Sequence, residues 1–205
     1  MRIGITMRIT RADSYEEYRD SIAQDWNKFM ASKFSRDQYM FIPNIEDSVT
    51  TFVRDWGIDM IFLSGGEDIG TDKSRDNTET MLIKYALDSK IPLVGVCRGM
   101  QMINAFFGGN TVDGGETFRK RHVAHDHEIF FLKKRRVVNS YHSRKITENS
   151  LGKGLSALGF DSVDGTVEAL GYKHVLGLMW HPERERDIDK DTADIIINHI
   201  REYGK

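Results

Sequence analysis

Short apolar runs alternate with longer polar stretches through the first half of this chain. The runs at 3–9, 38–43, 59–63 and 91–97 are rich in β-branched or aromatic residues, and each precedes a stretch with apolar residues at helical spacing. Consecutive parallel strands need a long crossover, usually a helix, so a parallel sheet produces this alternation. The run at 91–97 is apolar throughout, as in a strand buried on both faces. We therefore predict an α/β fold with a mostly parallel sheet and helices on both faces.

The helices and the later strands follow from the same periodicity. A first helix is predicted over 13–32, where Asp13 or Ser14 can cap it and apolar residues recur at Tyr15, Tyr18, Ile22, Trp26, Phe29 and Met30. Further helices are predicted at 45–57, 78–90, 98–109 and 192–204. Strands are predicted at 128–142, 163–172 and 173–183, with turns at Gly165 and Gly171. The stretch 110–127 is the least regular, and such segments are commonly functional or mobile.

Length and charge narrow the class of protein. A chain of 205 residues favours one domain, 1–205, over two. The net charge of -2 gives no general attraction to nucleic acid or an anionic membrane, and no apolar run reaches the ~18 residues of a membrane span. One cysteine excludes an intrachain disulfide, and the N-terminal sequence does not match a signal peptide, so we expect a cytoplasmic location. The basic run at 133–136 is either a solvated strand edge or a contact for an anion.

The single cysteine, Cys97, stands between Gly95 and Gly99, where an apolar run becomes a helical pattern. This is the GxCxG form of a nucleophile elbow, in which small neighbours allow a strained turn to project the nucleophile from the sheet edge. The N-terminus of the following helix favours thiolate over thiol. The alternative interpretation is a buried cysteine that acts as a small hydrophobic residue.

A thiolate nucleophile needs a base, and His181 is the candidate. It follows an apolar run directly, so it should emerge at the same edge of the sheet as Cys97. Pro182 disfavours the α conformation at His181, and Glu183 can orient and polarise the imidazole. A His-Pro turn alone is common on protein surfaces, so this interpretation depends on the elbow.

An oxyanion hole is the third part that acyl transfer requires. Gly65 and Gly66 end the strand predicted next to the cysteine strand, and a glycine pair lets backbone N–H groups approach an oxyanion closely. The N–H of Arg98, directly after the nucleophile, is the natural second donor. An ordinary loop would also use a glycine pair, so these residues are candidates only.

Four motifs in this order resemble the class I glutamine amidotransferase family over almost the whole chain. They are SGGED (64–68), GVCRGMQ (95–101), VNSYH (138–142) and HPE (181–183). The resemblance implies a flavodoxin-like sheet and a Cys97, His181 and Glu183 triad that attacks a glutamine-like γ-carboxamide without a cofactor. It also implies that the α-amino and α-carboxylate ends of the glutamyl group contact Gln101, Asn139, Ser140, Tyr141 and His142.

Within the family, Arg98 and the VNSYH motif are similar to free-standing γ-glutamyl hydrolases, since amidotransferase domains more often carry Leu after the nucleophile. The resemblance is strongest to bacterial hydrolases of capsule phosphoramidate biosynthesis that release a nucleotide-linked amine. It implies a small-molecule γ-glutamyl substrate, for which Arg119 and Arg121, with Lys120, could hold leaving-group phosphates unless they are merely solvated. The chain is short, its charged stretch at 114–128 is compressed, and SGGEDIG lacks the usual following proline. These departures leave the leaving-group pocket undefined.

Two further questions concern metals and rival functions. His122, His125 and His127 could form a metal site, but spacings of three and two residues do not bring all three rings to one side of either a helix or a strand. We therefore predict no metal site, and we favour contact with the leaving group as the use of these histidines. One rival function is a glutaminase subunit that delivers ammonia to a partner synthase. The other is a non-catalytic binding protein, against which the intact Cys97, His181 and Glu183 argue. The sequence does not indicate an oligomeric state.

Overall fold

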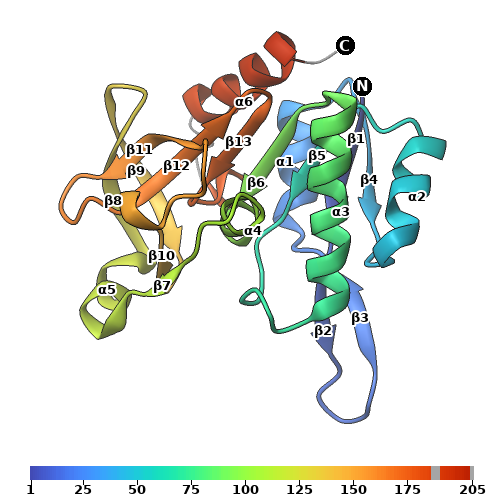
Figure 1. Ribbon diagram of the computed structural model, residues 1–205, viewed down its shortest axis with the longest axis horizontal. Coiled ribbons are helices and arrows are strands. Elements are labelled where there is room, and N and C mark those ends of the chain that lie inside the picture. Colours follow the sequence, from blue (N-terminus) through green and yellow to red (C-terminus); the bar gives the residue numbers. More distant parts are fainter. Residues whose placement is uncertain (186–189, 204–205) are drawn as a thin grey trace.

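A nine-stranded sheet forms the centre of the computed structural model, which describes residues 1–185 and 190–203. The strand order is β4-β1-β5-β6-β13-β12-β11-β8-β9 (Figure 1). The parallel half contains β1 (Arg2–Thr6), β4 (Gln38–Ile42), β5 (Met60–Leu63), β6 (Leu93–Val96) and β13 (Val175–Leu178). The antiparallel half contains β12 (Val167–Tyr172), β11 (Ser156–Asp161), β8 (Val123–Phe131) and β9 (Lys134–Tyr141). The predicted α/β class is confirmed, with an antiparallel extension on one side.

Helices cover both faces of the parallel half. One face carries α1 (Asp25–Lys33) and α6 (Lys190–Tyr203), and the other carries α2 (Val49–Asp55), α3 (Lys73–Ser89) and α4 (Arg98–Phe106) (Figure 1). Alternate residues of β5 divide between two cores. Met60 and Phe62 pack with α1, whereas Ile61 and Leu63 pack with α3 and α4. Burial on both faces explains why the central strands are apolar at every position.

The first strand and first helix differ from the prediction. The chain leaves β1 at Thr6 and forms a hairpin of β2 (Arg8–Arg11) and β3 (Tyr18–Ser21), which projects from the sheet at the bottom of Figure 1. The helix occupies only the last part of 13–32. Tyr15 and Tyr18 are 53% and 63% exposed, so their helical spacing creates no buried face, whereas Trp26, Phe29 and Met30 are buried. A helical pattern without a surface to cover does not make a helix.

The second half also departs from the prediction in detail. The stretch 110–127 contains β7 (Val112–Asp113) and α5 (Gly115–His122), and β7 pairs with β10 (Arg144–Lys145). The single strand predicted at 128–142 is the β8–β9 hairpin, which turns at Leu132 and Lys133 with positive φ angles. Strand β11 was not predicted. Gly171 lies within β12, and the turn occurs at Lys173 instead. Gly204, at the end of the last predicted helix, lies outside the described residues.

Short 3₁₀ helices complete the described elements: η1 (Glu46–Ser48), η2 (Glu148–Ser150) and η3 (Pro182–Arg184).

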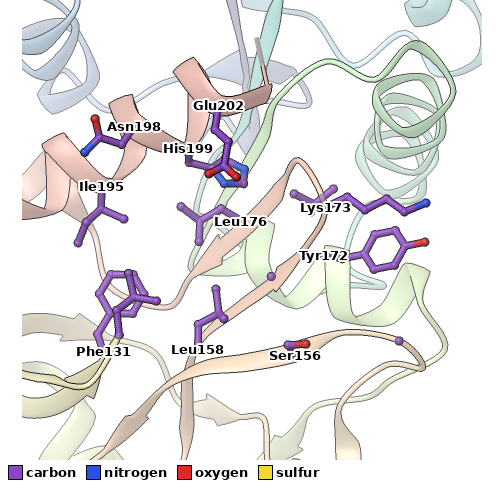
Figure 2. A pocket seen from close by; sticks show the side chains of 14 residues that line it. Phe131, Ser156, Leu158, Tyr172, Lys173, Leu176, Ile195, Asn198, His199 and Glu202 are labelled. Carbon is purple, nitrogen blue, oxygen red and sulfur yellow. The ribbon is translucent and has the colours of Figure 1, made fainter.

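The carboxyl ends of β5, β6 and β13 meet at one edge of the sheet because these strands are parallel neighbours. A pocket of about 560 Å³ lies instead between α6 and the β11–β13 region, where Figure 2 shows Leu158, Leu176 and Ile195 around it. Among the described helices, none has the length and apolar character to cross a membrane.

Candidate active site

Cys97 joins β6 to α4 in a strained turn. Its φ and ψ are 51° and -104°, a combination that non-glycine residues rarely adopt and that concentrates at functional sites. The Cys97 N–H donates to the Leu178 carbonyl at 2.7 Å, and the Cys97 carbonyl accepts from the Gln101 N–H at 3.1 Å. The backbone of Cys97 is therefore held by β13 on one side and by the first turn of α4 on the other.

Glycines around Cys97 allow α4 to approach the sheet closely. A Cβ atom on Gly95 would lie 2.5 Å from the Gly99 carbonyl carbon, and one on Gly99 would lie 2.3 Å from the Leu63 carbonyl oxygen. Real Cβ contacts are not this short, so both positions exclude any side chain. The two glycines thus fix how far Cys97 stands above the ends of β5 and β6.

His181 follows β13 and faces the elbow. Its Nδ1 lies 2.7 Å from Oε1 of Glu183, and both side chains are buried. Asn139 holds the backbone of His181 at both ends, because its Oδ1 accepts from the His181 N–H at 2.9 Å and its Nδ2 donates to the His181 carbonyl at 2.8 Å. Asn139 was expected to contact a glutamyl group, but its amide is occupied in positioning the histidine. Gly65 packs on the ring, since a Cβ there would lie 2.7 Å from His181 Cε1.

The electrostatics favour a thiolate and imidazolium pair. Burial raises the pKa of the Cys97 thiol, but the charge and hydrogen bond of His181, together with the charge of His142, outweigh it, so the net pKa lies below its ordinary value. Burial lowers the pKa of His181, yet the charges of Glu183 and Cys97 raise it to about 9. The lowered pKa increases the share of thiolate at Cys97, and near neutral pH the imidazole carries a proton that it can donate.

Glu183→Gln is expected to weaken this pair. The substitution removes the charge that raises the pKa of His181, so that pKa falls. The alkaline limb of kcat/KM against pH, which follows loss of the His181 proton, should move to lower pH, and turnover should fall by roughly a hundredfold. Glu148→Gln, at an exposed carboxylate, is the matched control. If the alkaline limb of kcat/KM stays unchanged in Glu183→Gln, a group other than Glu183 orients His181.

The loop after β5 presents backbone N–H groups beside His181. Nη2 of the buried Arg75 donates to the carbonyls of Ser64 and Gly65 at 2.9 and 3.0 Å. A trans peptide points its C=O and N–H in opposite directions, so the N–H groups of Gly65 and Gly66 point away from Arg75. Gly66 has a φ of 149°, and a Cβ there would lie 2.3 Å from Arg75 Nη1. The use of these N–H groups as an oxyanion hole stays a prediction.

A buried ion network links this loop to the elbow. Arg75 donates to Glu79 at 3.1 Å, and the Arg98 side chain pairs with Glu79 and Asp76. The Arg98 guanidinium thus points toward α3, while its backbone starts α4. Sequence reasoning missed Arg75 and Glu79, although their i, i+4 spacing in a predicted crossover was a weak signal.

The other residues of the resemblance lie around the same sheet edge. Gln101 is buried on α4, with Nε2 3.8 Å from the Met179 sulfur, and Ser140 is buried on β9. The Tyr141 ring lies edge-on to His181 at 5.5 Å and is 42% exposed. His142 is buried directly after β9. Contacts of these side chains with a glutamyl group stay a prediction.

The basic residues predicted to hold a leaving group are occupied elsewhere. Nη2 of Arg119 donates to both carboxylate oxygens of Asp113, at 2.8 and 2.6 Å. Arg121 donates to Asp161 and to Asp164, each at 3.0 Å. Lys120 pairs with Glu116 at 2.7 Å. These three residues are thus not free cations awaiting a phosphate.

The basic run at 133–136 is far from the nucleophile. It begins β9 at the turn of the β8–β9 hairpin, whereas the other end of β9 lies beside His181. Seven steps along a strand, at about 3.3 Å each, separate Lys134 from Tyr141 by roughly 23 Å. This run therefore lies at the end of β9 away from His181, and a role for it in binding an anion stays a prediction.

The histidines of 122–127 separate into two environments. His122 ends α5 and His127 lies in β8, and both are buried, whereas His125 is exposed. The spacing would separate the three rings only if the stretch formed a single helix or a single strand. The chain instead changes from helix to strand at Val123 and Ala124, where Ala124 has a φ of 61°, and this bend brings His122 and His127 together.

Comparison with known proteins agrees with this geometry. The γ-glutamyl-CDP-amidate hydrolase of Campylobacter jejuni is 34% identical over 202 residues, covering 92% of this chain and 93% of that protein. The glutamine amidotransferase-like protein YvdE of Lactococcus lactis is 33% identical over 177 residues, covering 69% of this chain and 74% of that protein.

The solved structures and the family model extend the comparison. A glutamine amidotransferase of Thermotoga maritima shares the fold with a TM-score of 0.63 at 13% identity, covering 98% of this chain and 84% of that one. The family model described as glutamine amidotransferase class-I matches residues 12–193. The chain therefore belongs to the class I glutamine amidotransferase family.

Proposed function

We propose that this protein is a cysteine hydrolase that cleaves a γ-glutamyl amide to glutamate and an amine. The observation that carries the proposal is the strained Cys97 at the end of β6, electrostatically paired with a His181 that is itself bonded to Glu183. This is the arrangement of nucleophile, base and orienting acid that acyl transfer needs. Membership of the family and the similarity to a hydrolase over nearly the whole chain support the same reaction.

In the first half-reaction the Cys97 thiolate attacks the γ-carbonyl carbon and forms a C–S bond. The carbonyl electron pair moves to oxygen, where the N–H groups of Gly65, Gly66 and Arg98 are the candidate donors. When the tetrahedral intermediate collapses, the C–N bond breaks and His181 gives its proton to the departing amine. The product is a γ-glutamyl thioester on Cys97.

In the second half-reaction water replaces the amine. Neutral His181 takes a proton from the water as its oxygen attacks the thioester carbon, and Glu183 stabilises the resulting imidazolium. Collapse breaks the C–S bond, releases glutamate and restores the thiolate. The two half-reactions need no cofactor. We place the protein in the cytoplasm, as expected for a chain with one cysteine.

We further propose that the leaving amine carries a nucleotide, as in γ-glutamyl-CDP-amidate, which would yield glutamate and CDP-amidate for capsule phosphoramidate synthesis. Support comes from the hydrolase of Campylobacter jejuni, which matches 92% of this chain. Two arginines lie beside the site, each with a carboxylate nearby: Arg8 Nη1 lies 4.0 Å from Glu67 Oε1, and Arg184 Nε lies 3.7 Å from Glu183 Oε1. Arg8 and Arg184 line a small hollow with Gly65 and Glu183, and the Arg184 guanidinium lies 4.7 Å from the Tyr141 ring centre.

A substrate comparison tests the proposal. We expect a γ-glutamyl nucleotide phosphoramidate to exceed both glutamine and γ-glutamyl-aminobutyrate in kcat/KM by at least roughly a hundredfold, which corresponds to ~2.8 kcal/mol at ~1.4 kcal/mol per decade. Contacts that glutamine cannot make stabilise the transition state, so the smaller substrates should lose kcat as well as affinity. The advantage should shrink at high salt, which screens exposed charges.

The rival function predicts a different outcome in the same assay. A glutaminase subunit would prefer glutamine, or would be inert with all three substrates until a synthase partner is added. Either result would replace the hydrolase proposal. Activity on γ-glutamyl-aminobutyrate alone would keep the hydrolase reaction and overturn the nucleotide-linked leaving group.

A further inference from the structure

Three buried histidines surround one buried carboxylate in the antiparallel half of the sheet, next to the active site. His122 ends α5, His127 lies in β8, His142 follows β9, and Glu168 lies near the start of β12. All four side chains are buried, and Glu168 is only 1% exposed. These four side chains thus bring their polar groups together beside strands drawn at the left of Figure 1.

One ring nitrogen of each histidine faces an oxygen acceptor. Nε2 of His122 lies 3.0 Å from Asp164 Oδ2, and Nδ1 of His142 lies 2.8 Å from the Arg144 carbonyl oxygen. Nδ1 of His127 lies 3.2 Å from Asp161 Oδ2. Since carboxylate and carbonyl oxygens only accept, the bonded nitrogens of His122 and His142 carry the N–H, whereas His127 Nδ1 faces Asp161 without a hydrogen bond. In the neutral imidazole the other nitrogen then carries a lone pair.

The remaining nitrogens all point toward Glu168. The separations from its carboxylate oxygens are 3.5 Å for His142 Nε2, 3.6 Å for His127 Nε2 and 3.9 Å for His122 Nδ1. Within the described chain, these nitrogens and both Glu168 oxygens form no hydrogen bond. A protonated imidazole bonded to a carboxylate would lie about 2.7–2.9 Å away. Buried acceptors that face one another without a shared cation are strongly unfavourable.

We propose that this cluster binds a Zn²⁺ ion through His122 Nδ1, His127 Nε2 and a Glu168 oxygen, with His142 Nε2 as the fourth ligand. The ligand atoms of His122, His127 and Glu168 lie within 4.8 Å of one another. In a tetrahedral zinc site, ligands about 2.0–2.2 Å from the metal lie about 3.3 Å apart, close to the distances from Glu168. Imidazole-rich sets with one carboxylate suit zinc, whereas Ca²⁺ and Mg²⁺ prefer oxygen ligands.

The surroundings of the cluster match the outer layer of a zinc site. Histidines that ligate zinc commonly donate their other N–H to a carboxylate or carbonyl, as His122 does to Asp164 and His142 does to the Arg144 backbone, while His127 Nδ1 lies 3.2 Å from Asp161. Arg121 donates to both aspartates and offsets their charge. That pairing makes the two aspartates poor ligands for a second cation. Zinc here would hold α5, β8, β9 and β12 together beside the active site.

The test measures metal content and thermal stability, which do not depend on the hydrolase reaction. Protein stripped with a chelator and returned to zinc sulfate should bind about one zinc per chain by mass spectrometry. Its Tm should rise by at least about 5 °C, because a ligand bound only to the folded state stabilises it. Magnesium sulfate should produce no shift. Absence of zinc binding and of a Tm shift in the wild type would overturn the proposal in favour of protonated histidines.

Variants locate the metal. Glu168→Gln and His127→Ala should lose the bound zinc and the Tm shift, with circular dichroism used to check folding. His125→Ala, at the exposed histidine of the same strand, should keep both. Cys97→Ala should also keep both, because the thiolate is not among the ligands. Loss of zinc in Cys97→Ala would place the metal on the catalytic thiolate. Retention of zinc in folded Glu168→Gln and His127→Ala would also contradict the proposed ligands.

Discussion

Cys97→Ala should abolish glutamate release while the protein stays folded. The thiolate forms the covalent bond of the proposed reaction, and no other cysteine can replace it. Removing a covalent nucleophile typically costs several orders of magnitude in kcat, so we expect a loss of at least ~10⁴. The Tm should change little, because the side chain is small and lies at the edge of the sheet. Steady-state glutamate release and a thermal melt measure the two effects.

A labelling experiment separates loss of the nucleophile from loss of the site. A glutamine-like diazo-ketone should alkylate Cys97 in the wild type, with one adduct per chain by mass spectrometry and parallel loss of activity. Cys97→Ser provides a near-isosteric comparison and should also be nearly inactive, since the pKa of a hydroxyl is too high for a stable alkoxide. Normal turnover by a folded Cys97→Ala protein would remove Cys97 from the mechanism.

Gly99→Ala should cause a large loss of stability. In an exposed helix this change is favourable by up to about 1 kcal/mol. Here the new Cβ would lie 2.3 Å from the Leu63 carbonyl oxygen and 2.8 Å from its carbonyl carbon. These are backbone atoms at the end of β5, so α4 itself must move. We expect the free energy of unfolding to fall by about 3 kcal/mol or more, as in severe overpacking.

Chemical denaturation of Gly99→Ala and a control variant measures this effect. Gly165→Ala is the control, because a Cβ there meets no atom within 4 Å although φ is 70°. It should cost about 1 kcal/mol from backbone strain alone. Gly99→Ala should also lose activity if enough folded protein is obtained, since Cys97 moves with α4. A stability within 1 kcal/mol of the wild type would show that α4 can withdraw from the sheet easily.

The sequence alone determined the elements whose signals are local. The apolar run before Cys97, the glycines on either side and the helical pattern after it all concern consecutive residues, and they predicted the turn between β6 and α4. The same holds for β5 before Gly65 and for β13 before His181. Parallel strands place their carboxyl ends together, so the meeting of these three segments followed from the predicted fold class.

Only the tertiary structure decided which side chains pair across elements. Helical spacing over 13–32 predicted one helix, but only Asp25–Lys33 is helical, and the exposed Tyr15 and Tyr18 belong to a hairpin region instead. The bond between Asn139 and the His181 backbone, the Arg75 link to the loop after β5, and the histidines around Glu168 join residues from different elements. Periodicity describes one element at a time, whereas these pairs depend on strand register and on where the chain bends. A single bend at Ala124 was enough to bring His122 and His127 to the same carboxylate.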